Sequence, residues 1–229
     1  MQHIYFMRHG ETSYNLAGRV QGGTDIPLNE NGIKEANMAR EFFIKNEIRF
    51  DKVISSPLKR AAKTASIVSG KPLEMIETDE RVRELNFGTA EGEAVVDLPQ
   101  GVLALFSHPQ DYEVPAGGET IAQLQERTGS FIADAGRLLA ERPDIENLLV
   151  VSHGAALRGF ISVIEKTPVR EFWVDNLENC CTVDAVYENG RFHVERYLHP
   201  LGGTKYMIPP WRRAKAADGS FTFARSERD

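Results

Sequence analysis

Hydrophobic residues along this chain switch between two spacings, which predicts an alternation of strands and helices. Residues 2–7 alternate in character before the polar His9-Gly10, and this pattern is typical of a buried strand that leads into a loop. A helix is predicted after Asn29, which can cap it, and a short strand over 52–55 follows. Apolar side chains recur on one face of that helix: Ile33, Ala36, Ala39, Phe42 and Phe43.

The same pattern repeats once more. Pro57 suits the first turn of a second helix, which presents the small residues Ala61 and Ala65 and ends at Gly70. A strand is expected over 73–77. The first third of the chain therefore predicts a β-α-β-α-β arrangement.

The periodicity weakens over residues 88–118, where Pro99, Pro109 and Pro115 act as breaks. We expect an irregular, partly helical insertion that could shape or cover a site.

Regular spacing then returns. A long helix is predicted from its apolar face, which consists of Ile121, Leu124, Phe131, Ile132, Ala135, Leu138 and Leu139. An apolar strand over 148–152 and a helix over 155–165 follow. The dipeptide Asn189-Gly190 favours a type I′ turn. It would join two further strands, over 182–187 and 192–197.

Composition limits the classes of partner. The chain has 229 residues, 41% of them hydrophobic, which is enough for one sizeable core. Its net charge of −6 argues against binding to nucleic acid or to an anionic membrane. The tail after Pro200 carries a local net charge of +3, which we interpret as a solvated tail; a lid over an anion site is the second option.

Cysteine usage and the N-terminus favour the cytoplasm. Cys180 and Cys181 are adjacent, which is poor geometry for a stabilising disulfide. The chain shows no signal-peptide pattern and no run approaching the ~20 apolar residues of a membrane-spanning helix. We therefore expect a cytoplasmic protein.

Two histidines follow predicted strands directly. His9 and His153 are each succeeded by a glycine, which allows backbone amides to approach a ligand closely. Strand ends of one parallel sheet meet at one edge, so we expect the two side chains to converge there. Arg60, one helical turn after Pro57, is predicted to reach the same edge.

These residue types suit a dianionic, tetrahedral oxyanion. Arg8 and Arg60 would supply charge, and helix N-termini would supply amide donors. Metal binding is the next alternative, but no two histidines stand at a close ligand spacing and Arg8 beside His9 opposes it.

Other interpretations of single residues stay open. His153 taken alone is more often structural than catalytic, and only its equivalence to His9 reverses that. Arg60 could be a solvated helix charge. Glu84 could form a structural pair with Arg81 or Arg83.

Five ordered motifs over about residues 3–197 resemble the histidine phosphatase superfamily, in its phosphoglycerate-mutase-like branch. These are Arg8-His9-Gly10-Glu11-Thr12, Ser55-Ser56-Pro57-Leu58-Lys59-Arg60, Arg83-Glu84-Leu85-Asn86-Phe87-Gly88, Gly117-Gly118-Glu119-Thr120 and Val151-Ser152-His153-Gly154. The resemblance implies an α/β fold, a three-layer α/β/α sandwich with a mostly parallel central sheet. It implies one domain over 1–200 with a cap insertion over 89–117 and a C-terminal tail over 201–229.

The resemblance also implies roles for single residues. His9 would be the nucleophile that forms a phosphohistidine, with Arg8, Arg60 and His153 as a phosphate clamp and Glu84 as the proton donor. No metal or other cofactor is implied. Further substrate and phosphate contacts are expected from Asn15, Gln21, Gly22, Gly154 and Asn179. The remaining histidines are interpreted as structural or surface residues: His3, His108, His193 and His199.

Three functions fit these residues. Hydrolysis of a small-molecule phosphate monoester is favoured because the interval 88–118 is short, whereas the family's mutases carry a long insertion there. Phosphoglycerate mutase-type transfer is the first alternative, and a non-catalytic phosphate-binding module is the second, although neither nucleophile nor acid is missing. Thr89-Ala90 stands where the family commonly has Trp, so the resemblance does not identify a particular substrate for this chain. A homodimer stays open.

Overall fold

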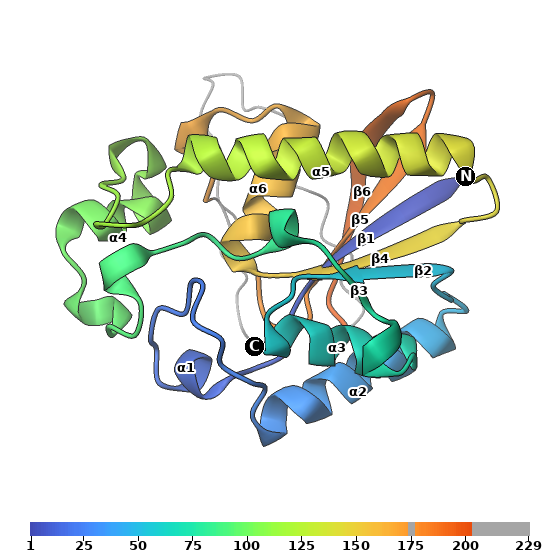
Figure 1. Cartoon of the computed structure of the whole chain (residues 1–229), viewed down its shortest axis with the longest axis horizontal. Coiled ribbons are helices and arrows are strands. Elements are labelled where there is room, and N and C mark those ends of the chain that lie inside the picture. Colours follow the sequence, from blue (N-terminus) through green and yellow to red (C-terminus); the bar gives the residue numbers. More distant parts are fainter. Residues whose placement is uncertain (174–176, 203–229) are drawn as a thin grey trace, which may run out of the picture.

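The computed structural model describes residues 1–173 and 177–202, and these residues form a six-stranded sheet between two layers of helices (Figure 1). The strand order is β3-β2-β4-β1-β5-β6. The first four strands of this order pair in parallel, and the last two add antiparallel ladders. The strand bounds are β1 Gln2–Arg8, β2 Lys52–Ser55, β3 Glu77–Thr78, β4 Asn147–Ser152, β5 Thr182–Glu188 and β6 Arg191–Leu198.

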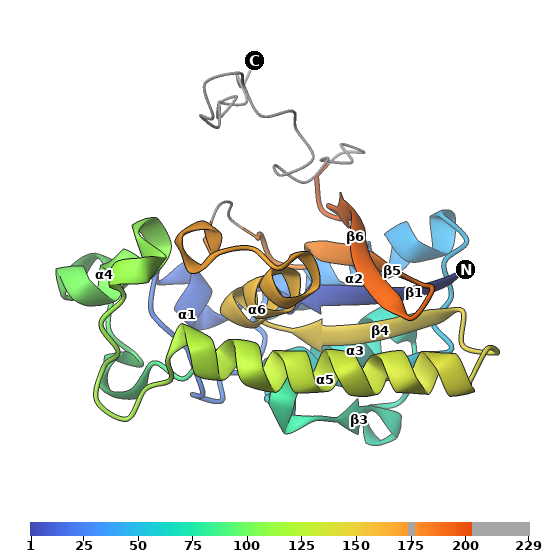
Figure 2. The same ribbon diagram turned by 90° about the horizontal axis from the view of Figure 1, so that it is seen from above.

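Helices cover both faces of the sheet, which confirms the predicted three-layer α/β/α fold. The pair α2 (Glu30–Lys45) and α3 (Lys59–Ser69) lies on one face, and α5 (Ile121–Glu141) with α6 (Gly154–Glu165) lies on the other (Figures 1 and 2). The short helices α1 and α4 lie beyond the carboxyl ends of the parallel strands (Figure 1). Their bounds are Ser13–Leu16 and Gln100–Ser107, and the 3₁₀ helices span Leu73–Met75, Glu80–Val82, Gly88–Ala90, Val95–Asp97, Pro109–Asp111 and Val169–Glu171.

Alternation along β1 divides the core between the two faces. Ile4 and Phe6 belong to the apolar cluster that includes the buried faces of α5 and α6. Tyr5 and Met7 belong to the second cluster, with the small residues of α2 and α3. Because successive side chains of a strand point to opposite faces, one short strand contributes to both cores.

The pairing of β1 with β4 sets the site edge. Arg8 pairs with Ser152 at the end of this ladder, and Ser55 of β2 pairs with Val151. The carboxyl ends of the three strands are therefore level. The sequence order alone did not predict that β4 inserts between β1 and β2.

Three local expectations are wrong. Residues 73–77 do not form a continuous strand, because Pro72 begins a 3₁₀ turn and the side chains of Leu73 and Met75 are exposed. Pro57 precedes α3, whose N-cap is Leu58. Ile33 is 40% exposed on α2, because the buried face of that helix is centred on Ala36, Ala39 and Phe43.

The insertion over 88–118 is irregular and partly helical, as predicted. It contains α4 and three 3₁₀ helices, and Val102 and Leu105 bury it against the main core. The predicted tail lies outside the described residues from 203 onward. Within the described part of the chain, no helix is both long and apolar enough to cross a membrane.

A close backbone approach joins α2 to the loop after β1. A Cβ atom on Gly32 would lie 2.1 Å from the carbonyl oxygen of Glu11 and 2.7 Å from its nitrogen. Neither backbone atom can move away as a flexible side chain would. The first turn of α2 therefore supports the loop that carries His9 only because residue 32 is glycine.

We predict that Gly32→Ala lowers the free energy of unfolding by about 1–3 kcal/mol, because the new methyl group overpacks this contact. The matched control is Gly129→Ala in α5, where the Cβ would lie 3.6 Å from Val163. In that variant the free energy of unfolding should rise by up to about 1 kcal/mol, because a glycine is removed from the middle of a helix. Urea unfolding of both variants measures the difference, and equal effects would contradict the backbone-contact argument.

Candidate active site

His9 and His153 leave the sheet side by side. They directly follow the paired residues Arg8 and Ser152, and the His9 amide donates a hydrogen bond to the Ser152 carbonyl at 3.0 Å. Their ring centroids are 5.1 Å apart, and their exposed fractions are 2% and 0%. The convergence expected from two strand ends is therefore observed, and its cause is the register of β1 with β4.

The tautomer of His9 is set by the next residue. Its Nδ1 donates to the carbonyl oxygen of Gly10 at 2.7 Å. The proton therefore lies on Nδ1, and the lone pair of Nε2 faces the site. A neutral imidazole whose Nε2 is unprotonated is the form that can act as a nucleophile.

Both histidines are held neutral. Burial lowers the pKa of His9 well below its usual value, and the charges of Arg60 and Arg8 lower it further. Burial likewise lowers the pKa of His153, followed by the charges of Arg60 and other neighbours. A protonated ring would place another positive charge beside two guanidinium groups, so both rings stay uncharged at neutral pH.

Arg60 is completely buried at the centre of the site. Its Nε lies 3.3 Å from His9 Nε2 and 3.2 Å from His153 Nδ1, so one N–H group is shared between the two rings. Its Nη1 and Nη2 donate to the carbonyl oxygens of Thr24 and Gly22 at 2.7 and 2.8 Å. Burial lowers the pKa of Arg60 to about 10, which leaves it a cation at neutral pH. The alternative of a solvated helix charge is therefore wrong.

Glu91 holds the loop that accepts Arg60. Its carboxylate accepts hydrogen bonds from the amide of Gly23 at 2.7 Å and from the amide and hydroxyl of Thr24 at 2.9 and 2.6 Å. Gly22 has a φ of +53°, and a Cβ there would collide with this carboxylate at 2.1 Å. Gly22 thus contributes a backbone carbonyl and a close approach.

Two buried donors at the site have no hydrogen-bond partner among the described residues. They are Nε of Arg8 and Nε2 of His153. His153 accepts from Arg60 through Nδ1, which leaves the proton on Nε2. Arg8 is fixed by its Nη1, which donates to the Leu177 carbonyl at 2.5 Å. Buried donors are rarely left unpaired, so this pair suits an anionic ligand beside His9.

Glu84 reaches the site from the segment that follows the 3₁₀ helix Glu80–Val82. Its carboxylate accepts from the amides of Leu85 at 2.9 Å, Ala156 at 3.1 Å and Ala155 at 3.4 Å. The last two amides belong to the first turn of α6, where the helix dipole favours a negative charge. The helix N-terminus expected to hold phosphate is therefore occupied by a carboxylate of this chain.

The two arginines near Glu84 in the sequence pair with other carboxylates. Arg81 pairs with Asp79 and Asp134, and Arg83 pairs with Glu80, so the alternative of a structural ion pair with either arginine is wrong. Gly154 lies beside it: a Cβ there would be 3.8 Å from both Glu84 Oε2 and Arg8 Nε.

The three predicted amide side chains line the loop after His9. Asn179 Nδ2 donates to the His9 carbonyl at 2.9 Å and lies 3.5 Å from Asn15 Oδ1. The Thr12 hydroxyl donates to Gln21 Oε1 at 2.8 Å and to Asn15 Oδ1 at 3.1 Å. These contacts place all three at the site and show that each also stabilises the loop.

Two residues with structural roles at the site were not assigned by the sequence. Thr64 accepts from the Gly10 amide at 3.1 Å and donates to the Arg60 carbonyl at 2.7 Å, which ties the loop after His9 to α3. Glu91 is the second, and the loop it holds is bound mainly through backbone amides, which leave no pattern in the sequence.

A model of the histidine phosphatase superfamily (branch 1) matches residues 4–199 of this chain. The chain belongs to this superfamily. The resemblance inferred from the five motifs is confirmed over nearly the same span.

Among the relatives, a "Metal-independent phosphoserine phosphatase" of Arabidopsis thaliana is 38% identical over 161 residues, which are 68% of this chain and 65% of that protein. The match thus spans slightly less than two thirds of that relative. A "Probable phosphoglycerate mutase GpmB" of Yersinia pestis is 32% identical over 215 residues, 92% of this chain and 97% of the relative. A solved phosphoserine phosphatase mutant of Entamoeba histolytica, in complex with phosphoserine, has a TM-score of 0.74 at 27% identity and covers 88% of this chain and 98% of its own. Membership of this superfamily is thus confirmed, and the names of the relatives include both phosphatases and a mutase.

The buried neutral histidines predict a loss of stability in acid. The folded-state pKa values of His9 and His153 lie well below the unfolded value of about 6.5, so below that pH only the unfolded state takes up their protons. Stability should fall as the pH drops from about 6.5, by up to about 1.4 kcal/mol per pH unit for each histidine. Urea unfolding at pH 7.5 and 5.5 measures this loss.

His153→Gln should show a smaller loss than the unmodified chain over the same pH interval, because one of the two groups is gone. His193→Gln, which changes a partly exposed histidine of β6, should keep the full loss. An unchanged pH dependence in His153→Gln would contradict the assignment of a buried neutral ring.

Proposed function

We propose that this chain hydrolyses a small-molecule phosphate monoester through a phosphohistidine at His9. The observation that carries the proposal is a buried imidazole whose Nδ1 is bonded to the Gly10 carbonyl, with two buried donors beside it, Arg8 Nε and His153 Nε2, that have no partner within residues 1–173 and 177–202. Arg60 adds a fixed cation at the same point. A nucleophile surrounded by donors and positive charge matches the needs of phosphoryl transfer, which depends on positioning and electrostatics.

In the first step the Nε2 lone pair of His9 attacks phosphorus. Glu84 enters this step in its protonated form. The P–O bond to the leaving group breaks and its electron pair stays on that oxygen, which takes the proton from Glu84. Arg8, Arg60 and His153 would stabilise the charge on the other phosphoryl oxygens. Because His9 Nδ1 keeps its hydrogen bond to the Gly10 carbonyl, the ring stays oriented while Nε2 carries the phosphoryl group.

In the second step water attacks the phosphohistidine. Glu84, now a carboxylate, accepts a proton from that water, the P–N bond breaks and its electron pair returns to Nε2. One carboxylate at this position could serve both steps. Glu84 lies at the N-terminus of α6 and near Arg8 and Arg60. Burial lowers the pKa of both arginines, and the charge of Glu84 partly opposes that effect. No step requires a metal ion, because the arginines supply the positive charge.

The remaining assignments belong to the same proposal. Asn15, Gln21 and Asn179 would contact the phosphoryl group or the rim of the substrate, and Gly22 and Gly154 would allow its close approach. The names of the Arabidopsis and Entamoeba proteins support phosphoserine, or a similar monoester of a small hydroxy acid, as the substrate class.

A phosphoglycerate mutase is the second candidate, favoured by the name of the Yersinia relative. Both reactions share the phosphohistidine and differ in the acceptor. The insertion over 88–118 is short and packs onto the core through Val102 and Leu105, and a short insertion supports hydrolysis over transfer. Cytoplasmic location and a homodimer stay predictions, as does the single domain over 1–200. The two free, buried cysteines suit a reducing compartment.

The first prediction separates the two roles of Glu84. Glu84→Gln keeps the side-chain shape but removes the transferable proton, so phosphorylation of the enzyme by an alkyl monoester should slow by about 10²- to 10⁴-fold, and by an activated aryl phosphate far less. The variant should then accumulate an acid-labile, base-stable phosphoenzyme, because hydrolysis of the phosphohistidine also needs the carboxylate. Rapid-quench labelling with radioactive substrate measures both effects.

The controls use the same experiment. Glu80→Gln changes an exposed carboxylate of the same segment and should behave as the unmodified enzyme. His9→Ala should carry no label. Label that attaches equally well without His9, or none under alkaline quench, would overturn the proposed nucleophile.

A second prediction distinguishes hydrolysis from transfer. In saturating EDTA, a panel of monoesters that includes phosphoserine and 3-phosphoglycerate should yield inorganic phosphate. With 2,3-bisphosphoglycerate added, ³¹P NMR should detect no 2-phosphoglycerate formed from 3-phosphoglycerate. Efficient isomerisation would make the mutase the better assignment, and activity restored only by Mg²⁺ or Zn²⁺ would contradict the metal-free mechanism.

A further inference from the structure

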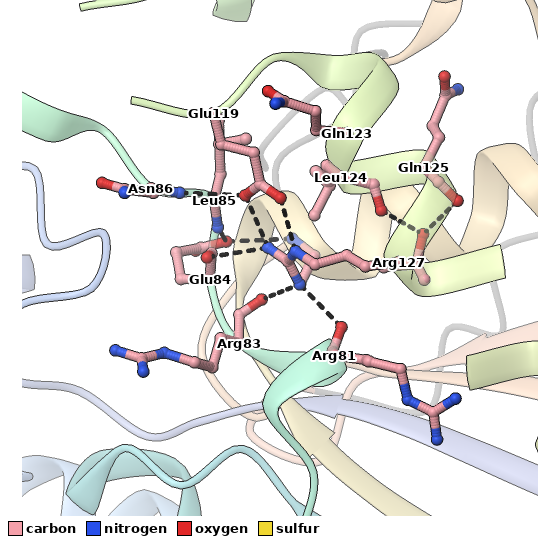
Figure 3. A network of polar contacts seen from close by, with 12 residues as sticks. Arg81, Arg83, Glu84, Leu85, Asn86, Glu119, Gln123, Leu124, Gln125 and Arg127 are labelled. Atoms are coloured by element: carbon pink, nitrogen blue, oxygen red, sulfur yellow. Dashed lines mark hydrogen bonds and ion pairs between the residues drawn. The ribbon is translucent and has the colours of Figure 1, made fainter. Parts of the chain in front are cut away.

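Arg127 of α5 uses all five of its N–H donors on one short segment and its counter-ion (Figure 3). Its Nη1 donates to the carbonyl oxygens of Arg81 and Arg83, each at 2.8 Å. Its Nη2 donates to the carbonyl of Glu84 at 3.0 Å. A single guanidinium therefore gathers three carbonyl groups of the segment that carries the proposed proton donor.

Glu119 completes the arrangement from the other side. Its two carboxylate oxygens accept from Arg127 Nε and Nη2 at 2.7 and 2.9 Å, a bidentate geometry. Its own backbone amide donates to the Asn86 carbonyl at 2.8 Å, and its Oε2 accepts from the Asn86 amide at 3.3 Å. The pair thus contacts the chain on both sides of Glu84. Both side chains are at most one-fifth exposed, so solvent screens the pair little.

Glu84 has no regular secondary structure to fix it. It follows a single 3₁₀ turn, and its carboxylate is oriented by the amides of Leu85, Ala155 and Ala156. The two bonds from Ala155 and Ala156 can form only if the backbone of Glu84 lies at the right height above α6. The Arg127 contact to the Glu84 carbonyl sets that height from α5.

A purely structural role is the competing explanation, since any bond from α5 would attach the segment. However, Arg81 already does this: it bonds to Asp79 within the segment and to Asp134 of α5 at 2.8 Å. That attachment lies three residues before Glu84. Arg127 is distinguished from Arg81 because it contacts the backbone of Glu84 itself.

We propose that the Arg127–Glu119 pair is a positioning device, which holds the Glu84 carboxylate where it can transfer a proton to the leaving group. This inference rests on the proposed function of Glu84 as the proton donor. It assigns a catalytic consequence to an arginine of α5 that lies outside the proposed phosphate-binding residues.

The test compares Arg127→Lys with Arg81→Lys. Lysine keeps the charge but offers donors from a single point, so it cannot bond three carbonyls and a carboxylate together. In Arg127→Lys, the rate of enzyme phosphorylation should fall by about 10- to 100-fold for an alkyl monoester, a fraction of the full general-acid contribution, and by less than about threefold for an activated aryl phosphate. KM should stay within about twofold. In Arg81→Lys, any loss in the rate of enzyme phosphorylation should be the same for the alkyl monoester and the aryl phosphate.

A double-mutant cycle shows whether Arg127 acts through Glu84. If it does, adding Arg127→Lys to Glu84→Gln should slow the alkyl monoester no further, because the proton donor is already absent. Glu119→Gln is the second variant, and it should reproduce the leaving-group dependence even if Arg127→Lys fails to fold. Thermal unfolding of each variant identifies those that are folded.

The outcomes separate this inference from the proposed function. If Glu84→Gln itself shows no dependence on the leaving group, the role of Glu84 as the acid is wrong. If Glu84→Gln shows the dependence but folded Glu119→Gln and Arg127→Lys behave like Arg81→Lys, or the losses add in the double mutant, the positioning role is overturned.

Discussion

The guanidinium of Arg60 carries a full charge with no exposed surface, and the surrounding site compensates for it. Burial of an unpaired ion is costly, so each of its nitrogens needs an acceptor. In the described part of the chain no carboxylate bonds to it, and its acceptors are the carbonyls of Gly22 and Thr24 and the unprotonated nitrogens of His9 and His153. The charge is therefore solvated by dipoles and stays electrostatically available to an anion.

That choice of acceptors determines the state of the histidines. A ring nitrogen can accept from Arg60 only while it is unprotonated, so the cation that would bind phosphate also keeps the nucleophile neutral. The Gly10 carbonyl then assigns the remaining proton of His9 to Nδ1. The loop carbonyls in turn depend on Glu91, whose carboxylate binds the amides of Gly23 and Thr24. The charge of Arg60, the tautomer of His9 and the conformation of the loop over 22–24 therefore depend on one another.

The sequence predicted those parts of the site that depend on strand ends. His9 and His153 follow apolar runs, and the level ends of parallel strands account for their meeting. The position of β4 between β1 and β2 could not be predicted, because pairing is decided by core packing on both faces and not by order along the chain. The predicted strand over 73–77 is wrong for a local reason. The segment contains apolar residues, but Leu73 and Met75 are exposed and do not pack against the core. Glu91 and Arg127 were not assigned because most of their partners are backbone groups, which carry no sequence signal.

The two halves of the proposed chemistry are built on different supports. His9, the proposed nucleophile, directly follows β1 and is tied to β4 by its amide bond to Ser152, and Arg60, the proposed phosphate-binding cation, stands on α3. The proposed acid stands on a segment without a ladder, and hydrogen bonds from α5 and from the first turn of α6 hold it. Phosphate binding is thus tied to the stability of the fold itself, whereas the acid could be displaced without loss of the sheet. The proton-transfer step is therefore the part of the reaction most open to change by substitutions that leave phosphate binding intact.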